Sequence, residues 1–146
     1  MTYTLSQAQA GRGSTVSIGA TPTMIGELKN SPVTRGKWKF EDTTNFESAS
    51  DSETLAVIRE NGSVSLEGNR VSSDAGQVLV ETAYQSGAIQ AFVVQLPKTA
   101  AQVTSGDKYS FSAFVESSEF TVDVEKAISF KIGLKISGPC TLVVGA

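Results

Sequence analysis

The chain has 146 residues, of which 40% are hydrophobic and 18% are charged, and its formal net charge is -3 at pH 7. It contains no histidine, so the most common metal ligand and the most common general acid or base at neutral pH are both missing. An acidic balance without clustered lysine and arginine argues against a protein that grips the phosphates of nucleic acid.

The length predicts one domain, residues 1–146, with a core large enough to need no disulfide or metal ion. The single cysteine, Cys140, cannot form an internal disulfide, which favours folding in a cytoplasm. Residues 1–14 lack the charged start and apolar stretch of a secretory signal, so we expect a flexible N-terminal arm on an unprocessed, soluble chain. No apolar run approaches the roughly 20 residues that span a bilayer.

Alternating apolar and polar residues predict β-strands along much of the chain. The predicted strands are residues 37–41, 55–60, 63–67, 89–96, 109–115, 120–124 and 128–137. Trp38 and Phe40 share one face of the first strand, and we expect them in the core. Residues 89–96 are apolar on both faces, which predicts a central strand covered on both sides. Residues 120–124 and 128–137 are expected to pair in antiparallel fashion.

Two connections stand out between these strands. Asn61-Gly62 lies between two of them and tolerates positive φ, so it predicts a tight β-hairpin. Residues 42–53 have little apolar content beyond Phe46 and predict an exposed loop, which is long for a compact domain.

One helix is predicted, over residues 73–86, because apolar residues recur there at helical spacing. Ser72 or Ser73 can cap its start, and Gly87 can end it.

Four groups of residues have chemical potential, and each has a plainer interpretation. They are Gly11-Arg12-Gly13, the acidic residues Asp42, Glu47, Asp51 and Glu53, the pair Glu116 and Glu119, and Cys140. The glycines lack a preceding strand and a third glycine, and the acidic residues lack the spacing of a calcium loop. The thiol has no histidine to activate it and is expected to be a small buried hydrophobic group. We therefore predict no catalytic, cofactor-binding or metal site.

The order of these features resembles the major tail tube proteins of long-tailed phages, which are related in fold to the tube proteins of type VI secretion systems. The similarity begins at Lys37-Trp38-Lys39-Phe40 and continues through residues 42–48. It extends through Asn61-Gly62 to residues 63–69, and the helix and later strands follow in the same order. It covers residues 33–142, most of the chain.

The resemblance implies a mainly β fold: a β-sandwich or partly closed barrel of antiparallel strands, with a flanking helix at 73–86 and a long extended loop at 42–60. It also implies a structural subunit of the virion tail, assembled in the host cytoplasm. Six copies would form a ring, and stacked rings would form a channel that conducts DNA without specific binding. Tape measure and tail terminator or tip proteins are the further partners implied.

In the family, the long loop reaches the adjoining ring, and residues 42–60 hold that place here. We expect this segment to become ordered against a neighbouring copy. Phe46, Leu55 and Ile58 are predicted to anchor it, and Arg59 to pair with an acidic residue across the contact.

Two alternatives stay open. One is the inner tube of a contractile tail or type VI secretion system. The other is a monomeric β-sandwich that binds a small ligand through Trp38, Tyr84 and Tyr109. An enzyme is the weakest hypothesis, because it rests only on scattered carboxylates.

Overall fold

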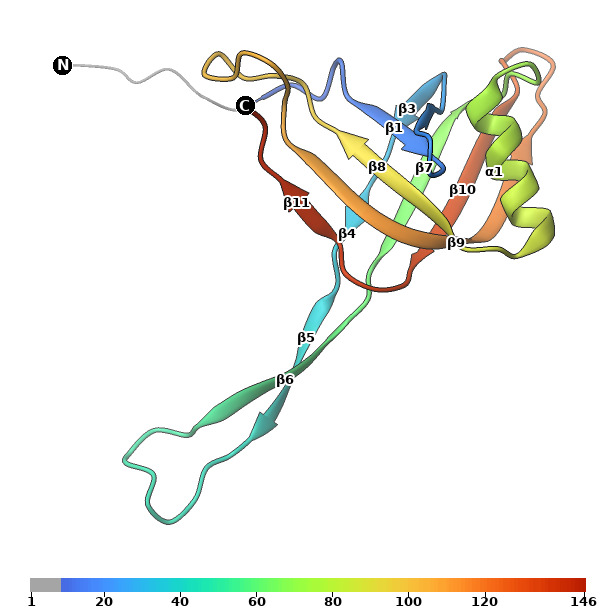
Figure 1. Ribbon diagram of the computed structural model, residues 1–146. Coiled ribbons are helices and arrows are strands. Elements are labelled where there is room, and N and C mark those ends of the chain that lie inside the picture. The colour runs from blue at the N-terminus through green and yellow to red at the C-terminus, as the bar shows by residue number, and fades with distance from the viewer. Residues whose placement is uncertain (1–8) are drawn as a thin grey trace.

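The computed structural model describes residues 9–146 as a curled antiparallel sheet with one helix and one long projecting hairpin (Figure 1). The strands are β1 (Thr15–Ile18), β2 (Thr23–Met24), β3 (Leu28–Asn30), β4 (Val33–Thr34), β5 (Lys37–Asp42), β6 (Thr54–Glu60), β7 (Ser63–Asn69), β8 (Gln90–Gln95), β9 (Lys108–Thr121), β10 (Ser129–Ile136) and β11 (Thr141–Val143), and the helix is α1 (Ala75–Ser86). In the described residues no helix is long and apolar enough to cross a bilayer. The first eight residues of the predicted N-terminal arm lie outside the described part.

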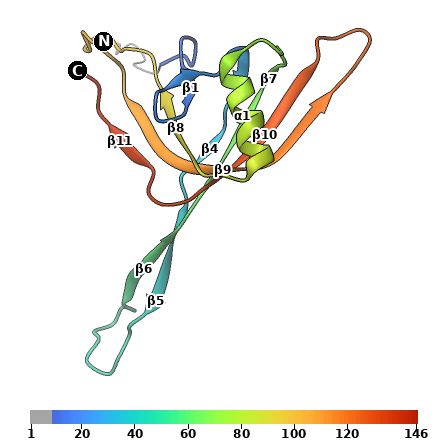
Figure 2. The ribbon, with the colours of Figure 1, turned by 45° about the vertical axis from the view of Figure 1, so that its right-hand side comes forward.

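Nine strands form the curled sheet in the order β2-β1-β8-β9-β10-β7-β3, with β11 beside β9 and β4 beside β7. The 14-residue strand β9 holds the sheet together, because its first half pairs with β8 and its second half with β10. A register shift between Gly133 and Leu134 of β10 marks a bulge in this pairing. Bulges bend and twist strands, and β9 curves strongly between its two partners (Figure 2). The prediction of a mainly β, partly closed barrel is confirmed.

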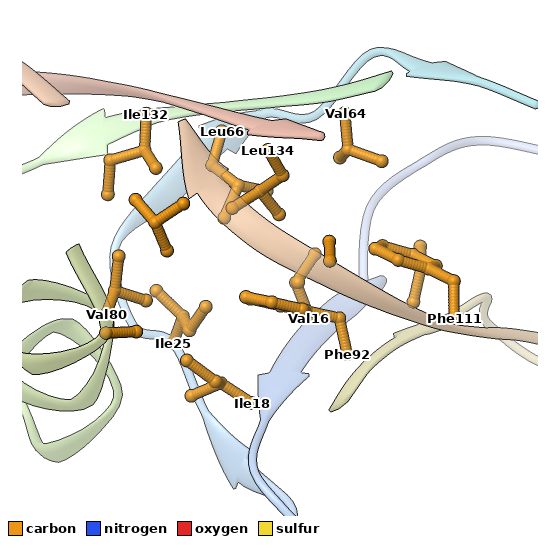
Figure 3. Packing of buried hydrophobic residues seen from close by; sticks show 14 of the residues in the cluster. Val16, Ile18, Ile25, Val64, Leu66, Val80, Phe92, Phe111, Ile132 and Leu134 are labelled. Carbon is orange, nitrogen blue, oxygen red and sulfur yellow. The ribbon is translucent and has the colours of Figure 1, made fainter. Parts of the chain in front are cut away.

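The core fills the concave side of this sheet. Phe92 of β8 stacks on Phe111 of β9 with ring centroids 5.8 Å apart. Val80 of α1 points toward the strand residues and covers the open side (Figure 3). The alternation over 128–137 produces the buried row of β10, and Cys140 is buried and unpaired as predicted.

Strand β8 corrects one prediction. It is central in the sheet, between β1 and β9, but only its concave face is buried. Phe92 and Val94 are buried, whereas Ala91 is exposed and Val93 half-buried, because α1 covers one side of the sheet only. In the part of the chain that the structure describes, no second layer covers the apolar residues of the convex face.

The helix begins with Asp74 as its cap, and not with Ser72 or Ser73 as predicted. One carboxylate oxygen of Asp74 accepts two backbone hydrogen bonds of 3.0 Å, from Gln77 N–H in the first turn and from Gly26 N–H before β3. The same side chain therefore caps α1 and connects the helix to the segment between β2 and β3. Gly87 ends the helix at φ 69, in the left-handed region that glycine favours, as predicted.

Asn61-Gly62 does not form the predicted hairpin. Strand β6 pairs with β5 alone, whereas β7 pairs with β3, β4 and β10, so the chain leaves one sheet and enters another at this point. Neither residue has positive φ. Gly62 is needed for close approach: a Cβ there would lie 1.6 Å from the carbonyl oxygen of Thr34.

The same crossing needs a second glycine. Gly36 has φ 108, and a Cβ on it would lie 2.1 Å from the carbonyl oxygen of Glu60. The two segments that enter and leave the hairpin thus cross in backbone contact. We call this crossing, residues 34–36 and 60–62, the neck.

Replacing Asp74 by alanine should lower the free energy of unfolding by about 1–2 kcal/mol, because both hydrogen bonds to its carboxylate are lost. Ser73→Ala is the matched control, since Ser73 does not cap the helix. Urea unfolding measures both variants, and an equal loss in the two would refute the assignment of the cap.

Gly62→Ala should destabilise the protein by about 1–3 kcal/mol, because the added methyl group meets backbone that can move only by opening the neck. Gly11→Ala serves as control, because a Cβ there has nothing within 4 Å. Thermal unfolding followed by circular dichroism tests the pair; unchanged stability of Gly62→Ala would show that the neck is not tight.

Candidate self-assembly interface

Strands β5 and β6 form a two-stranded hairpin that projects away from the curled sheet (Figures 1 and 2). Every residue of both strands is exposed. Among the described residues, neither strand pairs with any strand other than its partner in the hairpin. The long loop predicted over residues 42–60 is therefore partly β-strand. Residue 42 ends β5, residues 54–60 form β6, and residues 43–53 form the connecting loop.

Both faces of the hairpin carry apolar side chains. Cross-strand pairing places Trp38 opposite Arg59 and Phe40 opposite Ala56 on one face. On the other face, Leu55 and Ile58 lie opposite Glu41 and Lys39. Since no other layer within residues 9–146 covers either face, the hairpin exposes apolar surface on both sides.

Trp38 and Phe40 are not in the core, which corrects the prediction made from their alternation. Their side chains are 48% and 66% exposed. Alternation identifies the common face of a strand correctly, but here the strand extends beyond the body, where no helix or sheet lies over it.

The predicted contact residues all lie on this hairpin, spread along it and over both faces. Phe46, in the connecting loop, is fully exposed, and Leu55 and Ile58 of β6 are 57% and 61% exposed. Their proposed role in binding a neighbour stays a prediction. Val57, 58% exposed beside a register shift of the hairpin, joins this surface and was missed by the sequence analysis.

Two side-chain contacts brace the base of the hairpin. The guanidinium of Arg59 lies 5.7 Å from the ring centroid of Trp38, at cation–π distance. On the opposite face, Lys39 Nζ lies 2.9 Å from a carboxylate oxygen of Glu60. Hydrogen bonding and charge within this ion pair raise the pKa of Lys39 and lower the pKa of Glu60. Because both side chains are exposed, the pair mainly orients them.

Hydrogen bonds organise the loop at the far end. Thr44 Oγ1 accepts from Glu53 N–H at 2.8 Å, and Thr43 N–H donates to the carbonyl of Glu53 at 3.0 Å. Asp42 accepts from Thr44 N–H at 2.9 Å, and the hydrogen bonds from Thr44 lower the pKa of this carboxyl group. These hydrogen bonds join the two sides of the loop within the single chain. That the segment becomes ordered against a neighbour stays a prediction.

The groups considered for chemistry are not brought together into a site. In residues 9–146 no cluster of three or more histidine, cysteine or acidic side chains could hold a metal ion. Asp42 and Glu53 hydrogen-bond within the hairpin loop, while Glu116 and Glu119 are exposed on β9. The chain has no histidine near the buried Cys140 or anywhere else.

The aromatic residues of the ligand-binding alternative are also dispersed. Trp38 lies on the projecting hairpin, Tyr84 on α1 and Tyr109 on β9. Two of them contact arginines: Arg59 lies over Trp38, and Arg35 lies 5.1 Å from the ring centroid of Tyr109. The three rings therefore do not form one stacking platform.

Solved structures with a similar fold include two phage-like tails. The first is a chain from the tail of an empty gene transfer agent particle, refined with C6 symmetry; its TM-score is 0.71 at 17% identity, over 95% of this chain and 100% of that chain. The second is the SPP1 tail tube, with a TM-score of 0.64 at 18% identity, over 94% of this chain and 79% of that chain.

A third similar structure is the sheath-tube complex of an extracellular contractile injection system, with a TM-score of 0.67 at 10% identity, over 90% of this chain and 88% of that chain. A comparison with curated protein sequences gives no match. The family model described as phage tail tube protein matches residues 28–142, a range that includes the whole hairpin and most of the curled sheet. Since the match covers well over half of the sequence, the chain belongs to the phage tail tube proteins, structural components of the virion tail and not enzymes.

Proposed function

We propose that six copies of this chain form a ring, and that stacked rings form a tail tube whose channel conducts DNA. The observation that carries the proposal is the hairpin with two uncovered apolar faces. A two-stranded hairpin is marginally stable in water on its own, and contiguous exposed apolar surface is typical of a protein interface. Neighbouring copies would supply the missing layers.

The edges of the curled sheet support the same proposal. Strands β2 and β3 end the sheet order, and β11 pairs with β9 and with no other strand among the described residues. Unpaired N–H and C=O groups on such edges are templates for strands of another chain. Closure of a ring by identical copies would use them, and a head-to-tail contact that closes by rotation produces such a ring.

The number six is supported by likeness alone: the gene transfer agent tail of similar fold has C6 symmetry. In the proposed tube, Phe46, Leu55 and Ile58 contact a neighbouring copy, and Arg59 pairs with an acidic residue there. Tape measure and tail terminator or tip proteins are the proposed partners at the ends. All 146 residues are proposed to act as one domain.

The charge of the chain suits the passage of DNA. Binding to the phosphate backbone depends on neutralising lysines and arginines, and the net charge of -3 is repeated in every copy of the tube. DNA would therefore pass without specific binding.

A contractile tail is the second candidate, because the sheath-tube complex of a contractile injection system has a similar fold. The two candidates differ in whether a sheath surrounds the tube. A sheath gene beside the coding sequence, together with a sheath protein that coats purified tubes, would identify the chain as the tube of a contractile tail.

Shortening the hairpin should abolish tubes and leave the domain folded. Phe40 and Ala56 face each other across the ladder, so an Asn-Gly turn can replace residues 41–55 between them. The core of the curled sheet contains no hairpin residue, and the thermal transition should persist. Negative-stain microscopy and sedimentation measure assembly. Normal tubes from the shortened protein would rule out this role of the hairpin.

Single changes at exposed apolar positions separate assembly from folding. Phe46→Ser and Ile58→Ser should change monomer stability by less than about 0.5 kcal/mol, because both side chains are exposed. Each should raise the protein concentration needed for assembly at least tenfold. Val103→Ser, at a residue 84% exposed but outside the hairpin, is the control. If all three variants behave alike, the hairpin has no special role in assembly.

A further inference from the structure

The Asn61-Gly62 sequence in the neck is chemically reactive. An asparagine followed by glycine can cyclise, because glycine has no side chain to hinder attack by its own backbone nitrogen. The other asparagines, at positions 30, 45 and 69, are followed by serine, phenylalanine and arginine. Asn61 is therefore the asparagine whose sequence favours cyclisation most.

The side chain of Asn61 is exposed to water. Asn45 accepts a hydrogen bond from Glu47 N–H at 2.8 Å, and the amide of Asn69 donates to Glu27 at 3.2 Å. In the part of the chain that the structure describes, the side chain of Asn61 has no such partner. The restraint on Asn61 thus comes from its backbone.

The backbone on both sides of Asn61 is fixed. Glu60 belongs to the hairpin ladder, and the carbonyl of Gly62 accepts a hydrogen bond of 3.2 Å from Ile136 N–H in the curled sheet. Gly62 also lies so close to Thr34 that a Cβ on it would be 1.6 Å from the carbonyl oxygen. Cyclisation brings the nitrogen of Gly62 from contact distance to bonding distance of the Asn61 side chain. Gly62 must therefore leave its place against Thr34 before the ring can close.

The neck can open while the curled sheet stays folded. Among the described residues, the hydrophobic core includes no residue of the neck. The hairpin beyond the neck (Figure 1) pairs with no other described strand. Segments with few buried contacts open at a lower free energy than the core. Opening of the neck would release Gly62 without global unfolding.

We propose that Asn61 is a deamidation site that opening of the neck controls. In the opened neck the Gly62 nitrogen bonds to the side-chain carbonyl carbon of Asn61, and the side-chain amide nitrogen leaves as ammonia with the Gly62 N–H proton. Water then opens the succinimide ring at either of its C–N bonds and leaves aspartate or isoaspartate. The reaction consumes water and releases ammonia, and it needs no oxidant or reductant.

Either product changes the neck permanently. Both replace a neutral amide by a carboxylate next to Glu60, and isoaspartate also adds a methylene group to the main chain. Residues 61 and 62 alone connect Glu60 of β6 to Ser63 of β7. A longer main chain in so short a connection displaces Gly62 from Thr34. Deamidation thus marks a chain whose neck has opened, and this modification does not depend on the proposed tube.

Peptide mass spectrometry measures the reaction in the full chain. Trypsin cuts after Arg59 and Arg70, so one peptide contains both Asn61 and Asn69, and its fragment ions distinguish them. In protein unfolded by guanidinium chloride, Asn61 should deamidate at least tenfold faster than Asn69. In the folded protein the rate at Asn61 should fall at least tenfold below its unfolded rate. Asn61→Gln is the control and should lose the product, because the longer side chain cyclises much more slowly.

Two further measurements test the role of the neck. In the wild type, low concentrations of guanidinium chloride should speed deamidation of Asn61 before circular dichroism detects unfolding of the sheet. Without denaturant, Gly36→Ala should raise the rate at least threefold, because its Cβ would lie 2.1 Å from the carbonyl oxygen of Glu60 and force the neck open. Gly11→Ala, whose Cβ has nothing within 4 Å, should leave the rate unchanged.

The proposal is overturned if Asn61 deamidates equally fast in folded and unfolded wild-type protein, or no faster than Asn69 when unfolded. It is also overturned if the rate rises only together with global unfolding, or if folded Gly36→Ala reacts like the wild type. Should Gly36→Ala fail to fold, the denaturant series on the wild type still decides. None of these outcomes bears on the proposed tube.

Discussion

Two strands that pair with each other and with no other described strand have two faces to cover, and no part of residues 9–146 covers either face. The curled sheet covers one of its two faces internally, because its concave face packs on α1 and on its own opposite wall. The hairpin has no such layer, yet Phe40, Leu55, Val57 and Ile58 are apolar. The proposed function follows from this difference: the curled sheet has a core of its own, and the hairpin would present its surface to further copies.

The position of the hairpin depends on the neck. Gly36 and Gly62 let the entering and leaving segments cross in backbone contact, and any side chain at either place would force them apart. The ladder of β5 and β6 starts directly beyond this crossing, with Lys37 opposite Glu60. A projecting element fixed at its root and organised at its tip loses less conformational freedom on binding. The contacts at the base of the hairpin and the hydrogen bonds in its loop would thus lower the conformational entropy that the hairpin loses when it binds a neighbouring copy.

The sequence predicted the parts of the fold that depend on local periodicity. The alternation over residues 128–137 identifies β10, and the helical spacing after residue 73 identifies α1 to within two residues of its start.

The sequence prediction failed where the structure depends on which strands pair or pack with each other. Asn61-Gly62 has the composition of a turn, but its neighbours pair with different strands, and Gly62 serves close packing against Thr34. Trp38 and Phe40 alternate like core residues, and only the position of β5 outside the body shows that they are exposed. The predicted contact residues lie on the hairpin because an apolar strand next to a long polar loop is itself a local signal.

Amide hydrogen exchange across the hairpin, compared between free subunits and assembled tubes, tests the central claim most directly. In the free subunit, amides of residues 37–60 should exchange rapidly, because a two-stranded ladder without a covering layer opens at low free energy. In the tube the same amides should slow at least a hundredfold, while those of β10 in the core change little. Equal exchange of residues 37–60 in the two states would contradict the account.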